Sequence, residues 1–293
     1  MKAPRFRYVR AESLDEVLGL LAEHGDDARI LAGGQSLMPV LNMRLSQPRL
    51  VIDINRIAAL KGIALQGDVV RIGALTRHVE VMGSPIVARH LPLIAEAMPH
   101  VAHVAVRNRG TFGGSIALAD PSAEMPACIL ALGASLVVAS ARGRRTIVAD
   151  DFFLGLYETA REPDELLLEV LVPVQKPEHV SVFMEVSRRH GDFAIAGLAC
   201  CARADAQMLE DARLVYFGSE TRPTLAARAT AAVAGKPWSQ ASHDAACAAL
   251  AEDLDPIANA SGSPAIKLQL QRVLTRRALD KVRERANQRV LLQ

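Results

Sequence analysis

Residues 107–127 read RNRGTFGGSIALADPSAEMPA, and this stretch decides the fold of the chain. It places the Gly113-Gly114 pair between hydroxyl side chains, after two arginines and before an Asp-Pro step. Residues 30–45, ILAGGQSLMPVLNMRL, are similar in character, with Gly33-Gly34 followed by an amide and a hydroxyl side chain. Glycine has no Cβ that would hold a ligand away from the backbone. The two stretches therefore indicate two places where the backbone is closely approached.

The composition excludes several classes of protein. The chain has 293 residues, enough for two domains, and 50% of them are hydrophobic but only 4% aromatic, which predicts an aliphatic core. Lys and Arg number 34 against 32 Asp and Glu, so the basic bias of a nucleic-acid-binding protein is missing. The N-terminus lacks the apolar core of a signal peptide, and no apolar run reaches the length of a membrane span.

Cysteine usage favours a reducing compartment. The four cysteines form neither a CxxC pair nor a metal-ligand spacing, so we expect buried free thiols and a cytoplasmic, soluble protein. They are Cys128, Cys200, Cys201 and Cys247.

The first half of the chain predicts alternating helices and strands. Residues 13–25 have helical spacing, with Ser13 and Glu16 placed as in a capping box and Gly25 at the end. Residues 50–54 and 69–72 are typical of strands. Further expected elements are a helix at 86–98, a helix that Asp120-Pro121 opens and that runs to about Leu132, and a hairpin of strands 135–139 and 145–148.

The second half predicts an antiparallel sheet followed by helices. Residues 173–177 are typical of a linker. The expected strands are 181–187, 194–204 and 208–217, and the expected helices are 223–234, 239–252 and 264–286. For the last helix we expect a buried stripe of Ile266, Leu270, Val273, Leu274 and Leu279. The fold class is therefore mixed, α+β or α/β.

The two Gly-Gly loops indicate a phosphate-bearing ligand. Successive free N–H groups form a concave anion site, and the hydroxyls of Ser36, Thr111 and Ser115 can donate to phosphate oxygens. Two loops on separate segments suit a pyrophosphate, with one loop on each side. Neither loop matches GxGxxG or GxxxxGK[ST], and an isolated Gly-Gly pair is ordinarily a turn. The glycines alone therefore do not name the ligand.

Other polar residues leave two interpretations open. Asp120 either caps a helix or bonds to a ribose hydroxyl or an ordered water. Arg107 and Arg109 either balance phosphate charge or form structural or solvated ion pairs. His100 and His103 are spaced to share a helix face, but without a third ligand we expect no metal site. No Ser-His-Asp or Cys-His grouping stands out.

Taken together, the motifs of this chain resemble the FAD-binding medium subunit of the molybdenum hydroxylases. That family includes the medium subunit of aerobic carbon monoxide dehydrogenase and the FAD-binding subunit of xanthine dehydrogenase. The matching motifs follow the family order over nearly the whole chain. They are AGGQSLMPVLNMRL at 32–45, VDIN at 51–54, RNRGTFGGSIALADPSAEMPA at 107–127, PDELLLEVLVP at 163–173 and RRHGDFAIAG at 188–197.

The resemblance implies an α+β fold of the vanillyl-alcohol-oxidase type. Residues 1–177 would form an FAD-binding domain of two subdomains that divide near 55–60, and residues 178–293 a smaller C-terminal domain with an antiparallel sheet and helices. Phe193 fills a position where many relatives carry an aromatic residue, and where a relative has Tyr it lacks the hydroxyl. The FAD contacts that the resemblance implies are Ala32, Gly33, Gly34, Gln35, Ser36, Leu37, Thr111, Gly113, Gly114, Ser115, Asp120, Leu167 and Phe193.

The resemblance also implies an electron-transfer role in a complex. A large subunit with a molybdenum cofactor and a small subunit with [2Fe–2S] clusters would be partners, in a dimer of heterotrimers, and FAD would pass electrons to an external acceptor. The scattered cysteines agree, since iron–sulfur clusters need several thiolate ligands. Two alternatives are a self-sufficient small-molecule flavin oxidoreductase and a flavin-free assembly subunit. The sequence does not identify the substrate oxidised at molybdenum or the electron acceptor. Because the cofactor would carry out the redox chemistry, we expect no acid–base catalyst in this chain.

Overall fold

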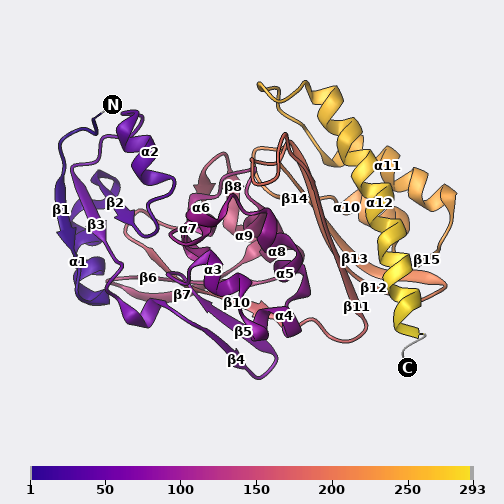
Figure 1. Ribbon diagram of the computed structural model, residues 1–293, viewed down its shortest axis with the longest axis horizontal. Coiled ribbons are helices and arrows are strands. Elements are labelled where there is room, and N and C mark those ends of the chain that lie inside the picture. Colours follow the sequence, from indigo (N-terminus) through magenta and orange to yellow (C-terminus); the bar gives the residue numbers. More distant parts are fainter. Residues whose placement is uncertain (1, 291–293) are drawn as a thin grey trace.

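The computed structural model describes residues 2–290 of the chain. The three larger β-sheets follow one another along the longest axis of the molecule (Figure 1). A small N-terminal lobe holds the first sheet, a central part holds the second, and the C-terminal part holds the third with three helices beside it. None of the helices in this part of the chain is long and apolar enough to cross a membrane.

The N-terminal lobe is a parallel three-stranded sheet, ordered β1-β3-β2, that packs on α1. The predicted helix at 13–25 is confirmed, because α1 has Ser13 as its N-cap, with Oγ accepting from the Glu16 N–H at 3.2 Å. Parallel pairing brings the carboxyl ends of neighbouring strands to one edge. The lobe consists of β1 (Arg7–Arg10), α1 (Leu14–His24), β2 (Ala28–Leu31), α2 (Leu37–Asn42) and β3 (Leu50–Asp53).

The second subdomain is an antiparallel five-stranded sheet, ordered β4-β5-β10-β6-β7. The predicted hairpin is confirmed, since β6 pairs with β7. The helices α3 to α9 and the β8–β9 hairpin connect these strands and are given with them here. They are β4 (Ile63–Gln66), β5 (Val69–Gly73), α3 (His78–Met82), α4 (Pro85–His90), α5 (Pro92–Ala97), α6 (Val104–Arg107), α7 (Phe112–Leu118), α8 (Glu124–Ala131), β6 (Ser135–Ser140), β7 (Gly143–Val148), α9 (Ala149–Phe152), β8 (Phe153–Gly155), β9 (Glu158–Thr159) and β10 (Leu166–Pro173).

Two predicted helices of this subdomain have different bounds. The helix expected at 86–98 is interrupted between α4 and α5, because the residue before a proline disfavours helical backbone and Pro92 begins a new helix. The helix expected to open at Asp120-Pro121 begins only at Glu124. Asp120 therefore does not cap it; its Oδ1 accepts from the Ser122 N–H at 2.9 Å within a turn.

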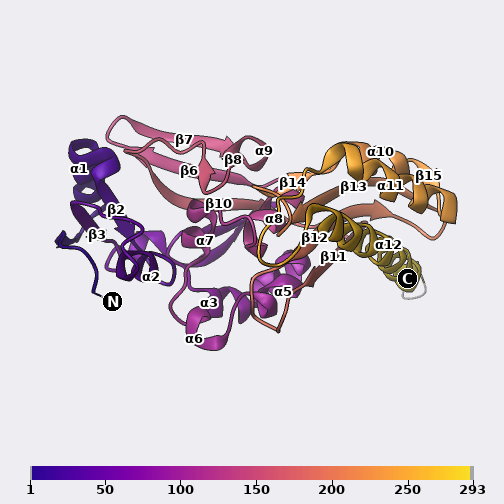
Figure 2. The same cartoon turned by 90° about the horizontal axis from the view of Figure 1, so that it is seen from above.

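The C-terminal domain has the predicted antiparallel sheet, with three long strands and three helices on one face. Figure 2 shows α12 lying across β11 and β12. The elements are β11 (His179–Val186), β12 (Ala196–Ala204), β13 (Met208–Phe217), β14 (Thr224–Leu225), α10 (Ala227–Val233), β15 (Lys236–Pro237), α11 (Gln240–Asp253) and α12 (Pro264–Val290).

The buried stripe of α12 differs from the prediction. Leu274 and Leu279 are buried as expected, but Ile266 is 56% exposed. The buried face begins instead with Lys267 and Gln271, whose polar ends reach the backbone at the end of β13. The aliphatic pattern missed this face because two of its positions are polar.

The other face of the C-terminal sheet packs on α5 and α8 of the second subdomain. Phe183 and Phe217 of this sheet therefore belong to the same core as α8. Two polar links reinforce the contact: the Gly218 N–H donates to the Pro121 carbonyl at 2.8 Å, and Arg285 pairs with Glu96. The C-terminal domain is thus anchored on two helices, one before and one after the second Gly-Gly loop in the sequence.

Candidate functional site

The two Gly-Gly loops lie against each other. A Cβ built on Gly33 would lie 2.5 Å from the Arg109 carbonyl oxygen and 2.8 Å from Gly110 Cα, both just before the second loop. No real side chain tolerates such a contact with backbone. Gly33 is therefore required for the approach of the two loops, and segments more than seventy residues apart in sequence form one site.

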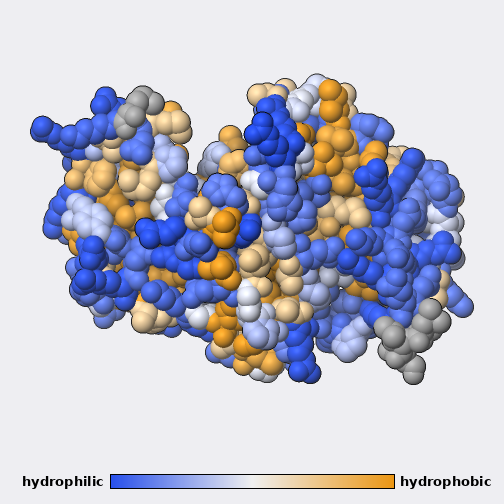
Figure 3. Space-filling view, in the orientation of Figure 1, coloured by the Kyte–Doolittle hydropathy of each residue, from blue (hydrophilic) through white to orange (hydrophobic). Residues whose placement is uncertain are grey.

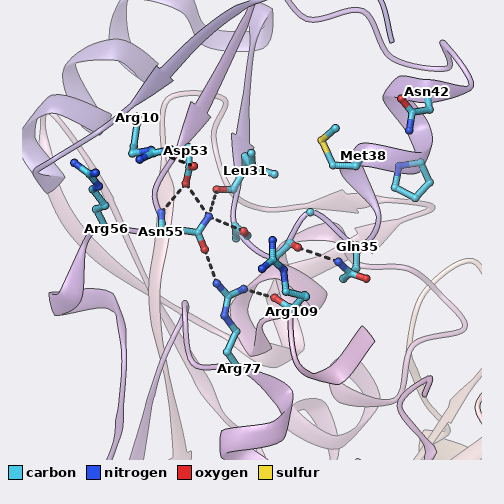
Figure 4. A pocket seen from close by; sticks show the side chains of 14 residues that line it. Arg10, Leu31, Gln35, Met38, Asn42, Asp53, Asn55, Arg56, Arg77 and Arg109 are labelled. Atoms are coloured by element: carbon cyan, nitrogen blue, oxygen red, sulfur yellow. Dashed lines mark hydrogen bonds and ion pairs between the residues drawn. The ribbon is translucent and has the colours of Figure 1, made fainter. Parts of the chain in front are cut away.

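A cavity of about 690 Å³ opens where the loops meet (Figure 4). The first loop and α2 form one wall, β3 and the segment after it form another, and arginines of the second subdomain close the third. The lining residues are Arg10, Leu31, Ala32, Gly33, Gly34, Gln35, Met38, Pro39, Asn42, Asp53, Asn55, Arg56, Arg77 and Arg109.

The first loop presents free N–H groups to this cavity. Within residues 2–290, the N–H groups of Gly33, Gly34, Gln35 and Ser36 donate to no protein acceptor. Gly34 has φ of +72°, the left-handed conformation that turns successive N–H groups to one side. Ser36 precedes α2 but its hydroxyl makes no capping bond, so it too is free to donate. The first loop therefore has the free donors that an anion-binding loop requires.

The second loop differs from that expectation, because its N–H groups are already bonded. Phe112 donates to the Thr76 carbonyl at 2.8 Å, Gly113 to the Ala74 carbonyl at 3.0 Å, and Gly114 to Thr111 Oγ1 at 3.1 Å. A Cβ on Gly113 would lie 2.5 Å from Ala74. Here the glycine serves close packing of α7 on the end of β5, while Gly114 and Ser115 remain partly exposed.

The arginines divide into structural and free ones. The Arg107 guanidinium donates to the carbonyls of Val101 and Ala102 at 2.9 and 2.7 Å, so its role is structural. The Arg109 side chain is exposed, lines the cavity and has no ion-pair partner among the described residues. Of the two interpretations, a structural role thus applies to Arg107, and a free cation to Arg109.

Arg77 and Asn55 connect the two loops through side chains. Arg77 donates to Asn55 Oδ1 at 2.5 Å and to the Arg109 carbonyl, and Asn55 Nδ2 donates to the Ala32 carbonyl at 2.8 Å (Figure 4). Asn55 also donates to Asp53 Oδ1 at 2.7 Å. The chain of bonds runs from the first loop, through β3, to the second subdomain.

Asp53 is a buried carboxylate at the edge of the cavity. Its Oδ2 accepts from the Tyr8 hydroxyl at 2.5 Å, and Arg10 Nε lies 3.9 Å away. Burial acts to raise the pKa of this carboxyl, but hydrogen bonds from Tyr8 and Asn55 outweigh it and lower the pKa below its ordinary value. The cavity therefore contains one firmly ionised carboxylate amid several arginines.

His78 fills the space behind the second loop. It is buried beside Gly110, and a Cβ on Gly110 would lie 2.9 Å from its Cδ2. Burial, with the nearby Arg107 and Arg77, lowers the pKa of His78 to about 4, so the ring is neutral at physiological pH. It acts as packing support and adds no charge.

Nine of the thirteen expected contact residues lie outside the cavity lining. Six of them belong to the two loops or directly follow one, namely Ser36, Leu37, Thr111, Gly113, Gly114 and Ser115, and the other three are Asp120, Leu167 and Phe193. Asp120 accepts from the Tyr157 hydroxyl at 3.1 Å, beyond the end of α7. Leu167 is buried in the core, next to an irregularity in the pairing of β10 with β6. Phe193 is 68% exposed on the loop between β11 and β12. The structure thus unites the first loop with Arg109 and leaves these three residues farther along the molecule.

The surface between these regions is hollowed. Figure 3 shows a recess at the upper side of the molecule, between the N-terminal lobe and the rest. The first loop lies on the N-terminal side of this recess, and α6 and α7 lie between it and the C-terminal sheet (Figure 1). The recess suits an elongated ligand that carries two negative charges near its centre.

The residues present fit a diphosphate-containing cofactor. Free N–H groups, an unbonded serine hydroxyl and two guanidinium groups without carboxylate partners are the donor types that bind phosphate. No group of three or more His, Cys, Asp or Glu in residues 2–290 could hold a metal ion. The N–H, hydroxyl and guanidinium donors of the cavity favour an anionic ligand.

Comparison with known families covers almost the whole chain. Residues 4–175 match the FAD-binding domain in molybdopterin dehydrogenase, and residues 181–282 match the C-terminal domain of the CO dehydrogenase flavoprotein. The chain is 40% identical over 289 residues to the 6-hydroxypseudooxynicotine dehydrogenase complex subunit alpha of Paenarthrobacter nicotinovorans, covering 98% of this chain and 97% of that protein. It is 37% identical over 282 residues to the carbon monoxide dehydrogenase medium chain of Hydrogenophaga pseudoflava, covering 96% and 98%.

Solved structures agree over the same length. Carbon monoxide dehydrogenase from Hydrogenophaga pseudoflava superposes with a TM-score of 0.94 at 38% identity, covering 96% of this chain and 98% of the other. Quinoline 2-oxidoreductase from Pseudomonas putida 86 superposes with a TM-score of 0.92 at 37% identity, covering 98% and 99%. One family accounts for the three main features of the structure. They are the contact of the two loops at Gly33, the donors suited to a diphosphate, and the C-terminal domain that packs on α8. The chain belongs to the FAD-binding medium subunits of the molybdenum hydroxylases.

Proposed function

We propose that this subunit binds FAD across the recess, receives electrons from [2Fe–2S] clusters of a small partner subunit and delivers them to an external acceptor. FAD supplies a redox centre that exchanges electrons singly or in pairs, and the chain supplies binding and orientation. The observation that carries the proposal is the cavity at the contact of the two glycine loops, with its free N–H groups and unpaired arginines.

The diphosphate is assigned to the first loop and to the exposed edge of the second. The N–H groups of Gly33–Ser36 donate to its oxygens, with the Ser36 hydroxyl beside them. The remaining assignments rest on the resemblance of the motifs to those of the family. The proposed FAD contacts are Ala32, Gly33, Gly34, Gln35, Ser36, Leu37, Thr111, Gly113, Gly114, Ser115, Asp120, Leu167 and Phe193.

The two ends of the site then have different tasks. Phe193, exposed on its loop, shields or stacks on the ring system of the cofactor through its aromatic face. Having no hydroxyl, it offers no hydrogen bond to that ring. Leu167 contributes through its position at the irregularity of β10, because its side chain packs in the core.

The complex contains a large molybdenum-cofactor subunit and a small iron–sulfur subunit, assembled as a dimer of heterotrimers. The names of relatives support a multi-subunit assembly, since one is a complex subunit and another a medium chain. Four free cysteines, all raised in pKa by burial, agree with a cytoplasmic location. We propose domains of residues 1–177 and 178–293, the first dividing near 55–60.

The test begins with the full chain, purified alone and together with its partners. We expect flavin bands in the visible spectrum, FAD released on denaturation, and iron–sulfur absorption only when the small subunit is present. Electrons supplied by the partners should bleach the flavin bands. If the chain carries no flavin alone, in complex, or after incubation with FAD, the proposal is wrong and a flavin-free assembly role replaces it.

The second candidate, a self-sufficient flavin oxidoreductase, predicts a different result. The isolated flavin-loaded chain would then be reduced by a small substrate without partners. A substrate pocket with a general base would favour it, but the cavity is lined by arginines, amides and one ionised carboxylate with a lowered pKa. The medium-subunit function is the better supported of the two.

A further inference from the structure

Arg77 occupies an unusual position for an arginine. It precedes α3, pairs in an isolated β-bridge with Thr111, and lines the cavity between the two subdomains. Its guanidinium donates to Asn55 Oδ1 on one side and to the Arg109 carbonyl on the other. The same Arg109 carbonyl is the atom that a Cβ on Gly33 would meet. One side chain therefore fixes the point at which the two loops touch.

The charge of this guanidinium is only partly compensated, because Glu80 and Asp53 act on it without forming an ion pair. Among residues 2–290, no carboxylate forms an ion pair with Arg77 or Arg109, whereas Arg56 pairs with Glu12 and Arg10 lies 3.9 Å from Asp53. Burial lowers the pKa of Arg77, and the positive charge of Arg109 lowers it further. Arg77 and Arg109 are neighbouring cations, and Arg77 is partly desolvated. Their repulsion costs free energy unless an anion binds between them.

We propose that Arg77 binds a phosphate of the cofactor and positions the two loops around it, with Arg109 as the second cation. This inference rests on the proposed function, because the anion is the diphosphate that the first loop would cradle. Arg77 thus has two separable tasks: its charge attracts the phosphate, and its planar fork holds Asn55 and the Arg109 carbonyl at a fixed spacing.

The geometry explains why arginine is needed rather than lysine. A guanidinium can donate in several directions at once, so it can bond Asn55, the Arg109 carbonyl and an oxygen of the ligand together. A lysine ammonium is a point charge on a flexible stem and would keep the attraction but lose the spacing. The two tasks can therefore be separated by substitution.

The experiment measures FAD affinity of the full chain in its complex after removal of the flavin, by quenching of flavin fluorescence over a series of salt concentrations. Arg77→Met should weaken FAD binding by about 10- to 100-fold, the range expected for a lost charged hydrogen bond, and should flatten its salt dependence. Arg77→Lys should weaken binding but keep the salt dependence. Arg89→Met is the matched control, because Arg89 is exposed on α4 away from the cavity.

A second titration uses ADP as a competitor for FAD. Loss of a phosphate contact should weaken ADP in Arg77→Met as well, whereas a distant folding defect would lower the amount of binding-competent protein without changing the salt slope. The inference is overturned if wild type binds FAD and both Arg77 variants bind it with wild-type affinity and salt dependence. Failure of wild type itself to bind FAD would instead reject the proposed function.

Discussion

The Nδ1 atom of His100 lies 3.1 Å from Oε1 of Glu185, and this pair joins the second subdomain to the C-terminal sheet. The Glu185 side chain is only 2% exposed, and the His100 ring packs on Phe183 with centroids 5.1 Å apart. The hydrogen bond to Glu185 is the main cause that raises the pKa of His100. Glu124, at the start of α8, is buried near the same pair.

This cluster predicts a pH-dependent stability. Burial raises the pKa of Glu124 from 4.5 to about 8, so the folded chain holds a proton that the unfolded chain has released across that window. Stability therefore falls as pH rises from about 4.5 to about 8. The raised pKa of His100 acts in the same direction, because its stabilising contribution is lost as pH rises through the folded value.

Replacing Glu124 by Gln should remove most of this slope. We expect Glu124→Gln to be less pH-sensitive than wild type across the window and more stable above it, since no carboxylate has to ionise in the core. Thermal unfolding followed across pH measures this. His100→Gln serves as the comparison, because it deletes the pair but leaves Glu124 in place. Parallel curves for wild type and Glu124→Gln would show that the carboxyl does not titrate as argued.

A second prediction concerns the contact of the two loops. Gly33→Ala should lower the flavin content of the purified chain by at least about tenfold, because the new Cβ would push the Arg109 carbonyl and Gly110 away by its contact at 2.5 Å. The secondary structure should remain. Gly33→Val should act in the same way and more strongly, through separation of the loops rather than through direct contact with the ligand.

The control for that variant is Gly19→Ala in α1, where a Cβ would meet nothing within 4 Å. Alanine in an exposed helix is more favourable than glycine by roughly 0.5–1 kcal/mol, so this variant should unfold at a slightly higher temperature with unchanged flavin content. A flavin content in Gly33→Ala equal to that of Gly19→Ala would contradict the role of the loop contact.

A third prediction concerns the C-terminal sheet. Gly197 of β12 stands opposite Phe217 of β13, and a Cβ on Gly197 would overlap the Phe217 ring. That ring is fully buried and stacks on Phe183 with centroids 5.6 Å apart, so it has little room to move. Gly197→Ala should cost about 1–3 kcal/mol, the usual range for an overpacked core.

Calorimetry or denaturant unfolding measures that loss. Gly83→Ala is the control, since its Cβ would meet only the Val79 carbonyl at an ordinary 3.5 Å. Combining Gly197→Ala with Phe217→Leu should recover part of the stability, because the shorter side chain vacates the space. Equal stability of Gly197→Ala and wild type would mean that the sheet relaxes without strain.

A fourth prediction concerns the thiols. Burial raises the pKa of Cys128, Cys200 and Cys247, and it raises the pKa of Cys201 to about 12. The thiolate is the reactive form, so none of the four should react quickly with a disulfide reagent at neutral pH in the native chain. All four should react after denaturation. One rapid, stoichiometric reaction in the native state would identify a thiol whose surroundings differ from those described.

Sequence reasoning predicted β3, β5, the β6–β7 hairpin and the three long strands of the C-terminal sheet, because their aliphatic runs survive folding. It did not predict the short strands β1, β4 and β15, and the helix expected at 223–234 begins only at Ala227, after the strand β14. It failed where tertiary contacts decide. Helix 86–98 contains helical periodicity, yet Pro92 interrupts it locally. In α12, Lys267 and Gln271 are buried because carbonyls at the end of β13 receive them, which no periodicity of apolar residues can reveal.

Only part of the site was predicted, again because tertiary contacts decide the rest. A glycine pair indicates that other backbone approaches closely, and the Arg109 carbonyl does approach Gly33 closely. The N–H groups of the second loop were expected to be free, but they donate to carbonyls just after β5 and to Thr111 Oγ1. Sequence reasoning missed Arg77 and Asn55, because neither is next to a glycine pair. Their hydrogen bond forms only when the fold brings the end of β3 close to the start of α3. VDIN was recognisable as a motif, but its role in spacing the loops was not.

The walls of the cavity belong to two subdomains, so its width is also the distance between them. A ligand that contacts both walls therefore stabilises the folded arrangement in which the subdomains lie at this distance. At a hundred times its dissociation constant, such a ligand adds about 2.7 kcal/mol to the stability of the folded chain. Loss of the ligand should consequently weaken the fold as well as the function.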